Sequence, residues 1–349
     1  MRETDLGVTL VDVAELSGVS IKTVSRVVNG EPNVAPATAD RVRRAIEELE
    51  YVPYEPARTL SRGKVGVIGL VWGWSVQSLF SSTLVGNILR ATSERGYNML
   101  LFSTDSHPNE QVTRALRGRQ VDGIILASAA ARDNVLIRQL EMTDEPYVVI
   151  WADDVDNCKK ASCVRIDDFA AARQGTEFLI GLGHRTIGAV SFRRDRSAIM
   201  AARQDGYRRA LQEAGIRPEN DLVFESAPPP TALGALAAQQ LLSTRKDLTA
   251  LFAFTDEIAL GAISAIGRMG MKVPDDISVM GFSDTTLSSA LNPPLTTIHE
   301  PLERISDLAV ELIIDRIERP SSERVDLVLE TSVAVRASCG PPRAGSRQG

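Results

Sequence analysis

Short, continuous apolar runs separated by helical stretches recur along most of this chain and restrict its possible folds most strongly. The runs cover residues 65–71, 99–102, 123–126, 147–151, 187–190, 250–254 and 278–282. A run that is apolar at every position is typical of a parallel strand covered on both faces. Several helical stretches end in a glycine just before the next run, at Gly96, Gly183, Gly215 and Gly270, as helices commonly do. The pattern predicts repeated βα units, too many for one compact sheet, and therefore an α/β domain of two lobes.

The first fifty residues show a different pattern, which predicts three short helices. Thr9 is a suitable N-cap for a helix, and Gly18 suits the left-handed turn that would end it. Ser20 can cap a second helix over residues 21–28, and a third helix can begin at Pro36, since proline is tolerated in a first turn. Two short helices around a glycine turn, braced by a third, are typical of an all-α helix-turn-helix domain.

The overall charge does not by itself indicate nucleic-acid binding. The 349-residue chain has a net charge of −6, and residues 1–63 hold 8 Lys/Arg and 10 Asp/Glu, a net of −2. The distribution is more favourable, because Lys22 and Arg26 are the only charged residues between Leu16 and Gly30. A local basic face can bind phosphate even on an acidic chain.

Membrane, metal and catalytic patterns are missing from the sequence. No apolar run reaches the roughly 20 residues that a membrane span needs, and residues 1–5 lead into no apolar signal core, so we expect a cytoplasmic protein. The cysteines and histidines show no metal-ligand spacing, and we expect no cofactor. Cys158 and Cys163 could form a redox pair, although two ordinary buried thiols are the simpler interpretation.

An enzyme with a Rossmann-like core is one alternative, but the motifs it would need are absent. No G-x-G-x-x-G follows residues 65–71, and neither a nucleophile elbow nor a P-loop occurs. The acidic pairs at residues 153–154 and 167–168 are weak candidates for paired catalytic carboxylates. We therefore expect the chain not to be an enzyme.

Several segments resemble the LacI/GalR family of bacterial repressors. They read VTLVDVA at residues 8–14, GVSIKTVSRVVNG at 18–30, IEELEYVP at 46–53, ARTL at 57–60, DEIALG at 256–261, VPDDISV at 273–279 and PLTTI at 294–298. The resemblance runs from about residue 8 to residue 335. It implies a nucleoid-associated homodimer on a pseudo-palindromic double-stranded DNA operator. It also implies an effector domain of the periplasmic-binding-protein type, with a ligand between two Rossmann-like lobes.

This resemblance suggests domain boundaries. Residues 1–53 would form the helix-turn-helix headpiece and residues 54–63 a hinge helix. The N-lobe of the effector domain would comprise residues 64–164 and 296–322, and the C-lobe residues 165–295 and 323–336. Residues 337–349, rich in Gly, Pro, Ser and Arg, should form a disordered tail. Family tetramers carry a C-terminal leucine heptad, and this tail has no leucine, so we expect a dimer.

A recognition helix beginning at Ile21 would read the major groove. The DNA-contacting residues implied are Thr9, Ser20, Ile21, Lys22, Thr23, Ser25, Arg26, Asn29, Thr38, Tyr51, Ala57 and Leu60. Thr9 and Ser20 could equally serve only as helix caps, and Tyr51 could be a core residue. Leu60 would wedge into the minor groove, unless it packs within the hinge dimer. The chain departs from the family at Ala35, and at Tyr54 and Glu55 in the hinge.

Ligands of open α/β sheets bind beyond the carboxyl ends of the strands. This rule and the resemblance together select Trp72, Trp74, Phe80, Ser128, Trp151, Arg203, Thr255, Asp256 and Asp284. Arg203 matches the family's main ligand-binding arginine, although it could instead be a helix-surface residue paired with Asp205 or Glu213. Core packing is the alternative for the tryptophans. Ser283 stands where many relatives carry an aspartate.

We therefore expect a sequence-specific transcriptional regulator, a repressor controlled by a small-molecule effector. Flat aromatic faces with a few polar groups suit a sugar or a sugar derivative. A non-sugar effector such as a purine is an alternative. A solute-binding receptor without a DNA role is another, against which the helix-turn-helix pattern argues. The sequence does not indicate whether the effector promotes or releases DNA binding.

Overall fold

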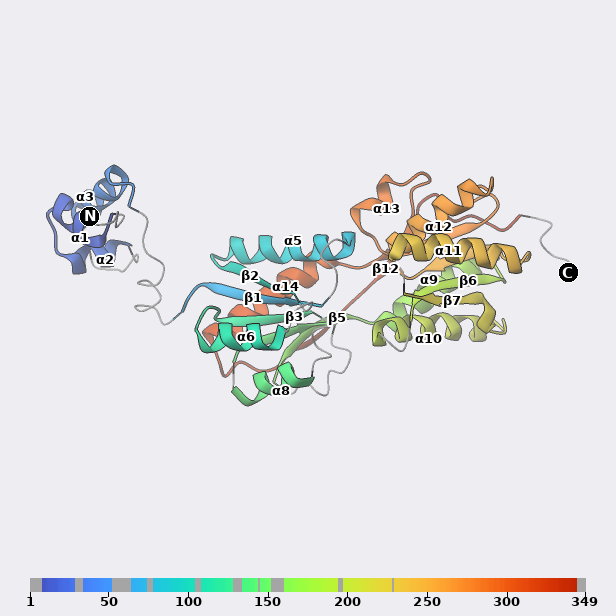
Figure 1. Ribbon diagram of the computed structural model, residues 1–349, viewed down its shortest axis with the longest axis horizontal. Coiled ribbons are helices and arrows are strands. Elements are labelled where there is room, and N and C mark those ends of the chain that lie inside the picture. The colour runs from blue at the N-terminus through green and yellow to red at the C-terminus, as the bar shows by residue number, and fades with distance from the viewer. Residues whose placement is uncertain are drawn as a thin grey trace, which may run out of the picture. The chain divides into compact units, whose positions relative to one another are not determined.

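The computed structural model describes residues 8–28, 34–51, 64–73, 78–103, 108–127, 134–143, 145–151, 160–193, 197–227 and 229–343. The described residues form two compact units (Figure 1). The first holds those up to Gly66 together with Arg119–Asp122, and the second holds the remainder. The predicted hinge, with Ala57 and Leu60, lies outside the described residues.

The N-terminal unit is the predicted bundle of three helices: α1 (Leu10–Ser17), α2 (Ile21–Val28) and α3 (Pro36–Glu48). Thr9 caps α1, with its N–H donating to Asp12 Oδ2 at 2.7 Å. Gly18 ends α1 with a φ of 64°, which only glycine adopts at little cost. One buried side chain from each helix, Val13, Val24 and Val42, meets the others in a small apolar core.

The second unit contains two lobes, each built on a six-stranded sheet. The N-lobe sheet has the order β11-β5-β4-β3-β1-β2. Its strands are β1 (Val67–Trp72), β2 (Asn98–Ser103), β3 (Gly123–Ala127), β4 (Tyr147–Ile150), β5 (Ser162–Ile166) and β11 (Asp326–Leu329), and all its pairings are parallel. Its helices are α5 (Leu79–Glu94), α6 (Pro108–Arg117), α8 (Asn134–Thr143) and α14 (Leu302–Glu318). Strands β1, β3 and β4 are buried at nearly every position. This burial explains why the corresponding runs of the sequence are apolar throughout.

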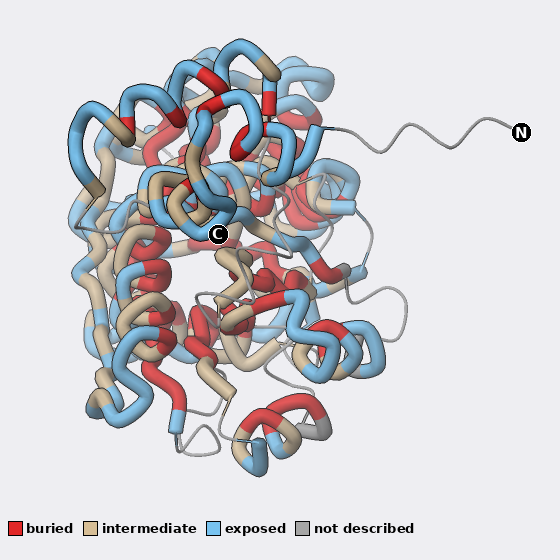
Figure 2. Tube along the Cα trace, turned by 90° about the vertical axis from the view of Figure 1, so that its left-hand side faces the viewer, coloured by how far each residue is buried: buried red, intermediate tan, exposed pale blue. Residues whose placement is uncertain are grey.

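The C-lobe sheet has the order β12-β10-β9-β8-β6-β7. Its strands are β6 (Ile187–Phe192), β7 (Val223–Ser226), β8 (Ala250–Ala253), β9 (Ser278–Ser283), β10 (Thr296–His299) and β12 (Ser332–Ala334), of which only β12 is antiparallel to its neighbour. Its helices are α9 (Asp168–Gly181), α10 (Ala198–Glu213), the 3₁₀ turn η3 (Asn220–Leu222), α11 (Pro230–Thr244), α12 (Asp256–Arg268) and α13 (Thr286–Ala290). In Figure 2 the buried residues alternate with exposed ones around the turns of the helices, as expected of helices packed on one side.

The chain crosses between the lobes at places that differ from the predicted boundaries. Residues 296–299 were predicted in the N-lobe, but β10 pairs with β9 of the C-lobe, Ile298 lying opposite Phe282. Residues 326–329 were predicted in the C-lobe, but β11 pairs with β5 of the N-lobe, Leu327 lying opposite Val164. The sequence of a short strand does not show which of the two sheets it pairs with, because either sheet could accept another strand at its edge.

The C-terminal segment is ordered further than its composition predicts. Residues 337–343 are described and residues 344–349 are not. Ser338 is fully buried, and its hydroxyl accepts a 2.8 Å hydrogen bond from the Thr296 N–H. Gly340 accepts one at 3.0 Å from the Ser278 hydroxyl. The predicted disorder is therefore wrong for residues 337–343, because these polar contacts hold the segment on the C-lobe.

Candidate functional site

An exposed surface of α2 presents the residues predicted to read DNA. Ile21 is 49% exposed, and Lys22 and Arg26 are exposed on the same helix. Val24 lies on another face of the same helix, where it is fully buried in the core. The Ser20 hydroxyl accepts from the Thr23 N–H at 3.2 Å, so α2 begins where the sequence predicted. The helix thus exposes both an apolar and two cationic side chains.

The other predicted DNA contacts are less uniform. Thr9 is exposed and Thr38 is half-buried, whereas Tyr51 is only 7% exposed and packs in the core. The Thr9 hydroxyl and N–H donate to Asp12, and they hold the pKa of that carboxyl below its ordinary value. Asn29, Ala57 and Leu60 lie outside the described residues. A helix-capping role therefore explains Thr9, and a core-packing role explains Tyr51, at least as well as contact with DNA does.

A cavity of about 600 Å³ lies in the second unit, at the carboxyl ends of strands from both lobes. Five predicted residues line it: Phe80, Trp151, Arg203, Thr255 and Asp256. The sequence interpretation did not select a further set of lining residues, which comprises Ser78, Ser81, Phe192, Arg193, Ser197, Ile199, Met200, Pro229, Pro230, Glu257, Ser283 and Thr285. Most of these follow strands β6 and β9 or begin helices α5, α10, α11 and α12. A wider use of the strand-end rule could have found them.

Two aromatic rings from the N-lobe form one wall of the cavity. Phe80, in the first turn of α5, lies with its ring centroid 5.4 Å from that of Trp151, and the rings are tilted by 50°. Trp151 directly follows β4 with a φ of 53°. Next to this wall, the Leu79 N–H donates to Glu257 Oε1 of the C-lobe at 2.9 Å. The N-lobe side of the cavity therefore offers flat apolar surface and a direct link to the opposite lobe.

Arg203 lies at the bottom of the C-lobe side and is only 4% exposed. Its Nε donates to Asp168 Oδ1 at 2.7 Å and its Nη1 to the carbonyl of Phe254 at 2.7 Å. Its guanidinium carbon lies 3.4 Å from the centroid of the Phe282 ring, a cation–π arrangement. The alternative of a helix-surface arginine is therefore wrong, because α10 directs this side chain inward.

Glu300, which the sequence interpretation did not single out, completes the group around Arg203. Its Oε1 accepts from Arg203 Nη2 at 3.3 Å and from the Ser283 hydroxyl at 2.8 Å. Its Oε2 is buried and has no hydrogen-bond partner among the described residues. Burial raises the pKa of Glu300 to about 7, although the charge of Arg203 opposes the rise. The acid directly follows β10, the strand that the sequence placed in the wrong lobe.

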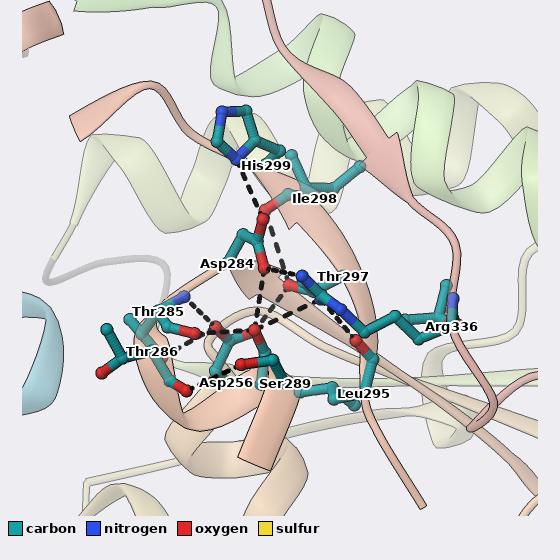
Figure 3. A network of polar contacts seen from close by, with 12 residues as sticks. Asp256, Asp284, Thr285, Thr286, Ser289, Leu295, Thr297, Ile298, His299 and Arg336 are labelled. Atoms are coloured by element: carbon teal, nitrogen blue, oxygen red, sulfur yellow. Dashed lines mark hydrogen bonds and ion pairs between the residues drawn. The ribbon is translucent and has the colours of Figure 1, made fainter. Parts of the chain in front are cut away.

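Asp256 connects the cavity to a polar network within the C-lobe (Figure 3). Its Oδ1 accepts from the Thr297 hydroxyl at 2.6 Å, and its Oδ2 accepts from the Thr285 N–H at 2.7 Å. Burial raises the pKa of Asp256 to about 6, against the effect of these hydrogen bonds. Both oxygens are thus engaged, and Asp256 fixes the segment after β9 as well as lining the cavity.

Two predicted effector residues do not line the cavity. Trp72 is 1% exposed and packs in the core with Ile68 and Leu70, because residues two apart on a strand share a face. Asp284 binds Arg336 Nη2 at 2.6 Å and His299 Nδ1 at 2.9 Å instead (Figure 3). Trp74 and Ser128 lie outside the described residues.

Other chemistry suggested by the sequence finds less support here. Cys163 is buried, whereas Cys158 lies outside the described residues. Asp168 forms an ion pair with Arg203, and Asp167 caps α9. Among the helices of the described part of the chain, none is long and apolar enough to cross a membrane.

Each of the two units matches a known protein family. Residues 9–54 match the lacI family of bacterial regulatory proteins, and residues 176–339 match a periplasmic binding protein-like domain. The regulator CelR of Thermobifida fusca is 36% identical over 341 residues, which cover 95% of this chain and 98% of CelR.

Solved structures give the same result. A complex of CelR with cellobiose has a TM-score of 0.71 at 34% identity and covers 95% of this chain and 99% of its own. The lac repressor dimer bound to operator and the anti-inducer ONPF has a TM-score of 0.82 at 26% identity, covering 96% and 99%. The chain therefore belongs to the LacI family and is a DNA-binding transcriptional regulator with a helix-turn-helix domain and a periplasmic-binding-protein-like effector domain.

Proposed function

We propose that the cavity binds a sugar or a sugar derivative, and that this ligand controls operator binding by a repressor. The observation that carries the proposal is the pairing of an aromatic wall, formed by Phe80 and Trp151, with Arg203 on the opposite side. Apolar ring faces pack against the C–H face of a sugar, and a guanidinium donates to its hydroxyls. The structure of CelR with cellobiose, a related regulator, supports the same ligand class.

The ligand would act by changing the relation of the two lobes. Both lobes line the cavity, and the Leu79–Glu257 hydrogen bond joins them beside it. A ligand shifts a conformational equilibrium only by its difference in affinity for the two states. A sugar that contacts Trp151 and Arg203 at once would favour one spacing of the lobes, and with it one operator affinity.

At the DNA end, we propose that α2 lies in the major groove. Lys22 would donate to guanine and Ile21 would contact a thymine methyl, while Arg26 would contact phosphate or a base. The related lac repressor was solved as a dimer on its operator, which supports a homodimer on a pseudo-palindromic site for this chain. Sedimentation at micromolar protein should then give a dimer and neither a monomer nor a tetramer.

A ligand screen followed by calorimetry tests the effector proposal. Cellobiose, other neutral sugars, sugar phosphates and purine bases are added to the full chain, and melting temperatures are compared, because a bound ligand stabilises the folded state. A sugar should raise the melting temperature and bind with measurable heat, and Lys22→Ala should keep that binding. Stabilisation by purines alone would contradict the sugar class.

A heteroaromatic effector such as a purine is the second candidate, which the same aromatic wall favours. A planar base could stack on Trp151 or Phe80, whose rings lie close together. The two ligand classes differ in their dependence on Phe80. Phe80→Leu should weaken binding of a base more than binding of a sugar, because leucine keeps apolar contact with a sugar but offers no ring on which a base can stack.

A further inference from the structure

We propose that Glu300 and Asp168, which lie behind Arg203, make the cavity select a neutral hydroxyl-bearing effector and reject its anionic derivatives. This inference rests on the proposed sugar-binding function and narrows the ligand class. An arginine in a ligand cavity would by itself favour carboxylates and phosphates, because its fork of donors matches them. The surroundings of this arginine reverse that preference.

The charge of Arg203 is already neutralised within the protein. The guanidinium carries five N–H donors, and the contacts to Asp168, Phe254 and Glu300 occupy one each on Nε, Nη1 and Nη2. The side chains of Asp168 and Glu300 are 9% and 0% exposed, so water screens their charges poorly. Two N–H groups remain for a ligand, but they belong to a cation that two carboxyl groups already flank.

The wider set of charged groups at the cavity points the same way. Among the described residues that line the cavity or contact Arg203, the cations are Arg193 and Arg203, and the acids are Asp168, Asp256, Glu257 and Glu300. A neutral polyol can donate hydrogen bonds to such acids and accept from the arginine. An anion would add a further negative charge to this set of described residues, in which acids outnumber bases.

Helix N-termini often attract anions, but at three of the four described helices that begin at this cavity a backbone donor is already engaged by a side chain. Helices α5, α10, α11 and α12 begin at the cavity. Helix α11 follows Pro229 and has no side-chain cap, whereas each of the other three has a hydroxyl at its N-cap. Each hydroxyl accepts a hydrogen bond from a backbone N–H. The Ser81 N–H donates to Ser78 at 3.1 Å, the Met200 N–H to Ser197 at 3.3 Å and the Ile258 N–H to Thr255 at 3.2 Å. The Leu79 N–H is taken by Glu257. The helix termini therefore offer an anion fewer donors than their number suggests.

Glu300 also gives the selection a signature that can be measured. The charged groups that act on it are Arg203 on α10, Asp168 on α9 and Asp256 on α12, and the Ser283 hydroxyl donates to it. Its pKa is raised to about 7, so it is partly protonated near neutral pH. An anion bound beside Arg203 would raise that pKa further, and binding would then take up a proton. A neutral ligand would not.

The test uses three probes of one shape: cellobiose, its uronate with one CH₂OH oxidised to a carboxylate, and the uronamide of that acid. Calorimetry at pH 8, in two buffers of different ionisation enthalpy, gives the affinity and the number of protons taken up. We expect cellobiose and the uronamide to bind, the uronate to bind at least about tenfold more weakly, and proton uptake with the uronate alone.

Glu300→Gln should remove the proton uptake and narrow the difference between uronate and uronamide by about tenfold, since one buried negative charge is lost. Glu318→Gln, which removes an acid from the exposed end of α14, is the matched control and should change neither. Equal binding of uronate and uronamide by the natural protein would overturn the inference but leave sugar binding intact, as would an unchanged difference in Glu300→Gln. If the uronate binds and neither neutral probe does, this inference fails, whereas the sugar proposal itself is decided by the wider ligand screen.

Discussion

The two units of this regulator differ in where their charged side chains lie. In the described part of the N-terminal unit every Lys, Arg, Asp and Glu is exposed or half-buried, and Ser17 is its one buried polar residue. The α/β unit buries Asp168, Arg203, Asp256 and Glu300 around its cavity. On the proposed function, DNA phosphates would contact exposed side chains, whereas a small ligand would contact buried ones. Charges at the surface can be changed at little cost in stability, but buried charges connect ligand binding to folding.

Arg203→Ala should therefore have the largest effect. It removes the proposed ligand donor and leaves Asp168 and Glu300 buried without their cation, a loss that typically costs about 3–5 kcal/mol of stability. Calorimetry with the sugar identified in the screen should show at least a hundredfold loss of affinity, and denaturant titration should show the destabilisation. Retention of sugar affinity within about threefold would remove Arg203 from the binding site.

The pH dependence of stability should separate the two units next. Glu300 has a pKa of about 7 in the folded state, above its ordinary 4.5. A raised pKa means that its contribution is most favourable below pH 4.5 and is lost as the pH rises through 7. The unfolding free energy of the natural chain, relative to Glu300→Gln, should fall by roughly 3 kcal/mol between pH 4.5 and pH 8.

Denaturant titrations of both proteins across this pH range give the comparison. Asp256 titrates in both, so the difference isolates Glu300. A difference that stays flat with pH would show that Glu300 keeps an ordinary pKa. The N-terminal unit, whose described ionisable residues are not buried, should contribute little to the slope.

Arg26→Ala should weaken DNA binding about tenfold and leave sugar binding and stability nearly unchanged. An exposed cation on α2 contributes to phosphate or base contacts, each usually worth about 1–3 kcal/mol at a base edge. Fluorescence anisotropy with a labelled operator duplex at several salt concentrations measures the change, and a phosphate contact would also reduce the salt slope by about one. Unchanged DNA affinity would place the reading surface elsewhere.

Thr9→Ala should have the smallest effect, because it removes only the side-chain part of a helix cap. Its hydroxyl donates to Asp12 at 2.6 Å, and such caps contribute about 1 kcal/mol. Thermal unfolding should register that loss, with Thr9→Ser as the conservative control that retains a hydroxyl. A DNA-affinity loss much greater than the change in stability would show that Thr9 also contacts the backbone of DNA.

Local rules predicted the parts of the fold that depend on neighbours in sequence. The N-terminal helices begin at Thr9, Ser20 and near Pro36 as their caps indicate, and the apolar runs became buried strands. Strands β5 and β7 escaped notice because each is short and contains a charged residue, Arg165 in β5 and Glu225 in β7. The lobe to which β10 and β11 belong depends on tertiary pairing, which single-strand patterns do not encode.

The site was predictable to a similar depth. Arg203 and Phe80 were found through the family resemblance, and Thr255 and Asp256 through the strand-end rule. Trp72 satisfied that rule but points into the core. Glu300 was missed because the strand before it, β10, was not among the apolar runs and was assigned to the wrong lobe. Its burial depends on β10 and α10 meeting in the C-lobe.

The most direct test of the whole account measures operator affinity with and without sugar. A labelled duplex from the region upstream of the regulator's own gene is titrated with the full chain, first alone and then with saturating sugar from the screen, and Arg203→Ala is treated identically. Sugar should change the operator affinity of the natural chain at least about fivefold, within the usual range of allosteric coupling, and should leave that of Arg203→Ala unchanged. Equal affinities with and without a sugar that binds would contradict control of the DNA-binding unit by the cavity.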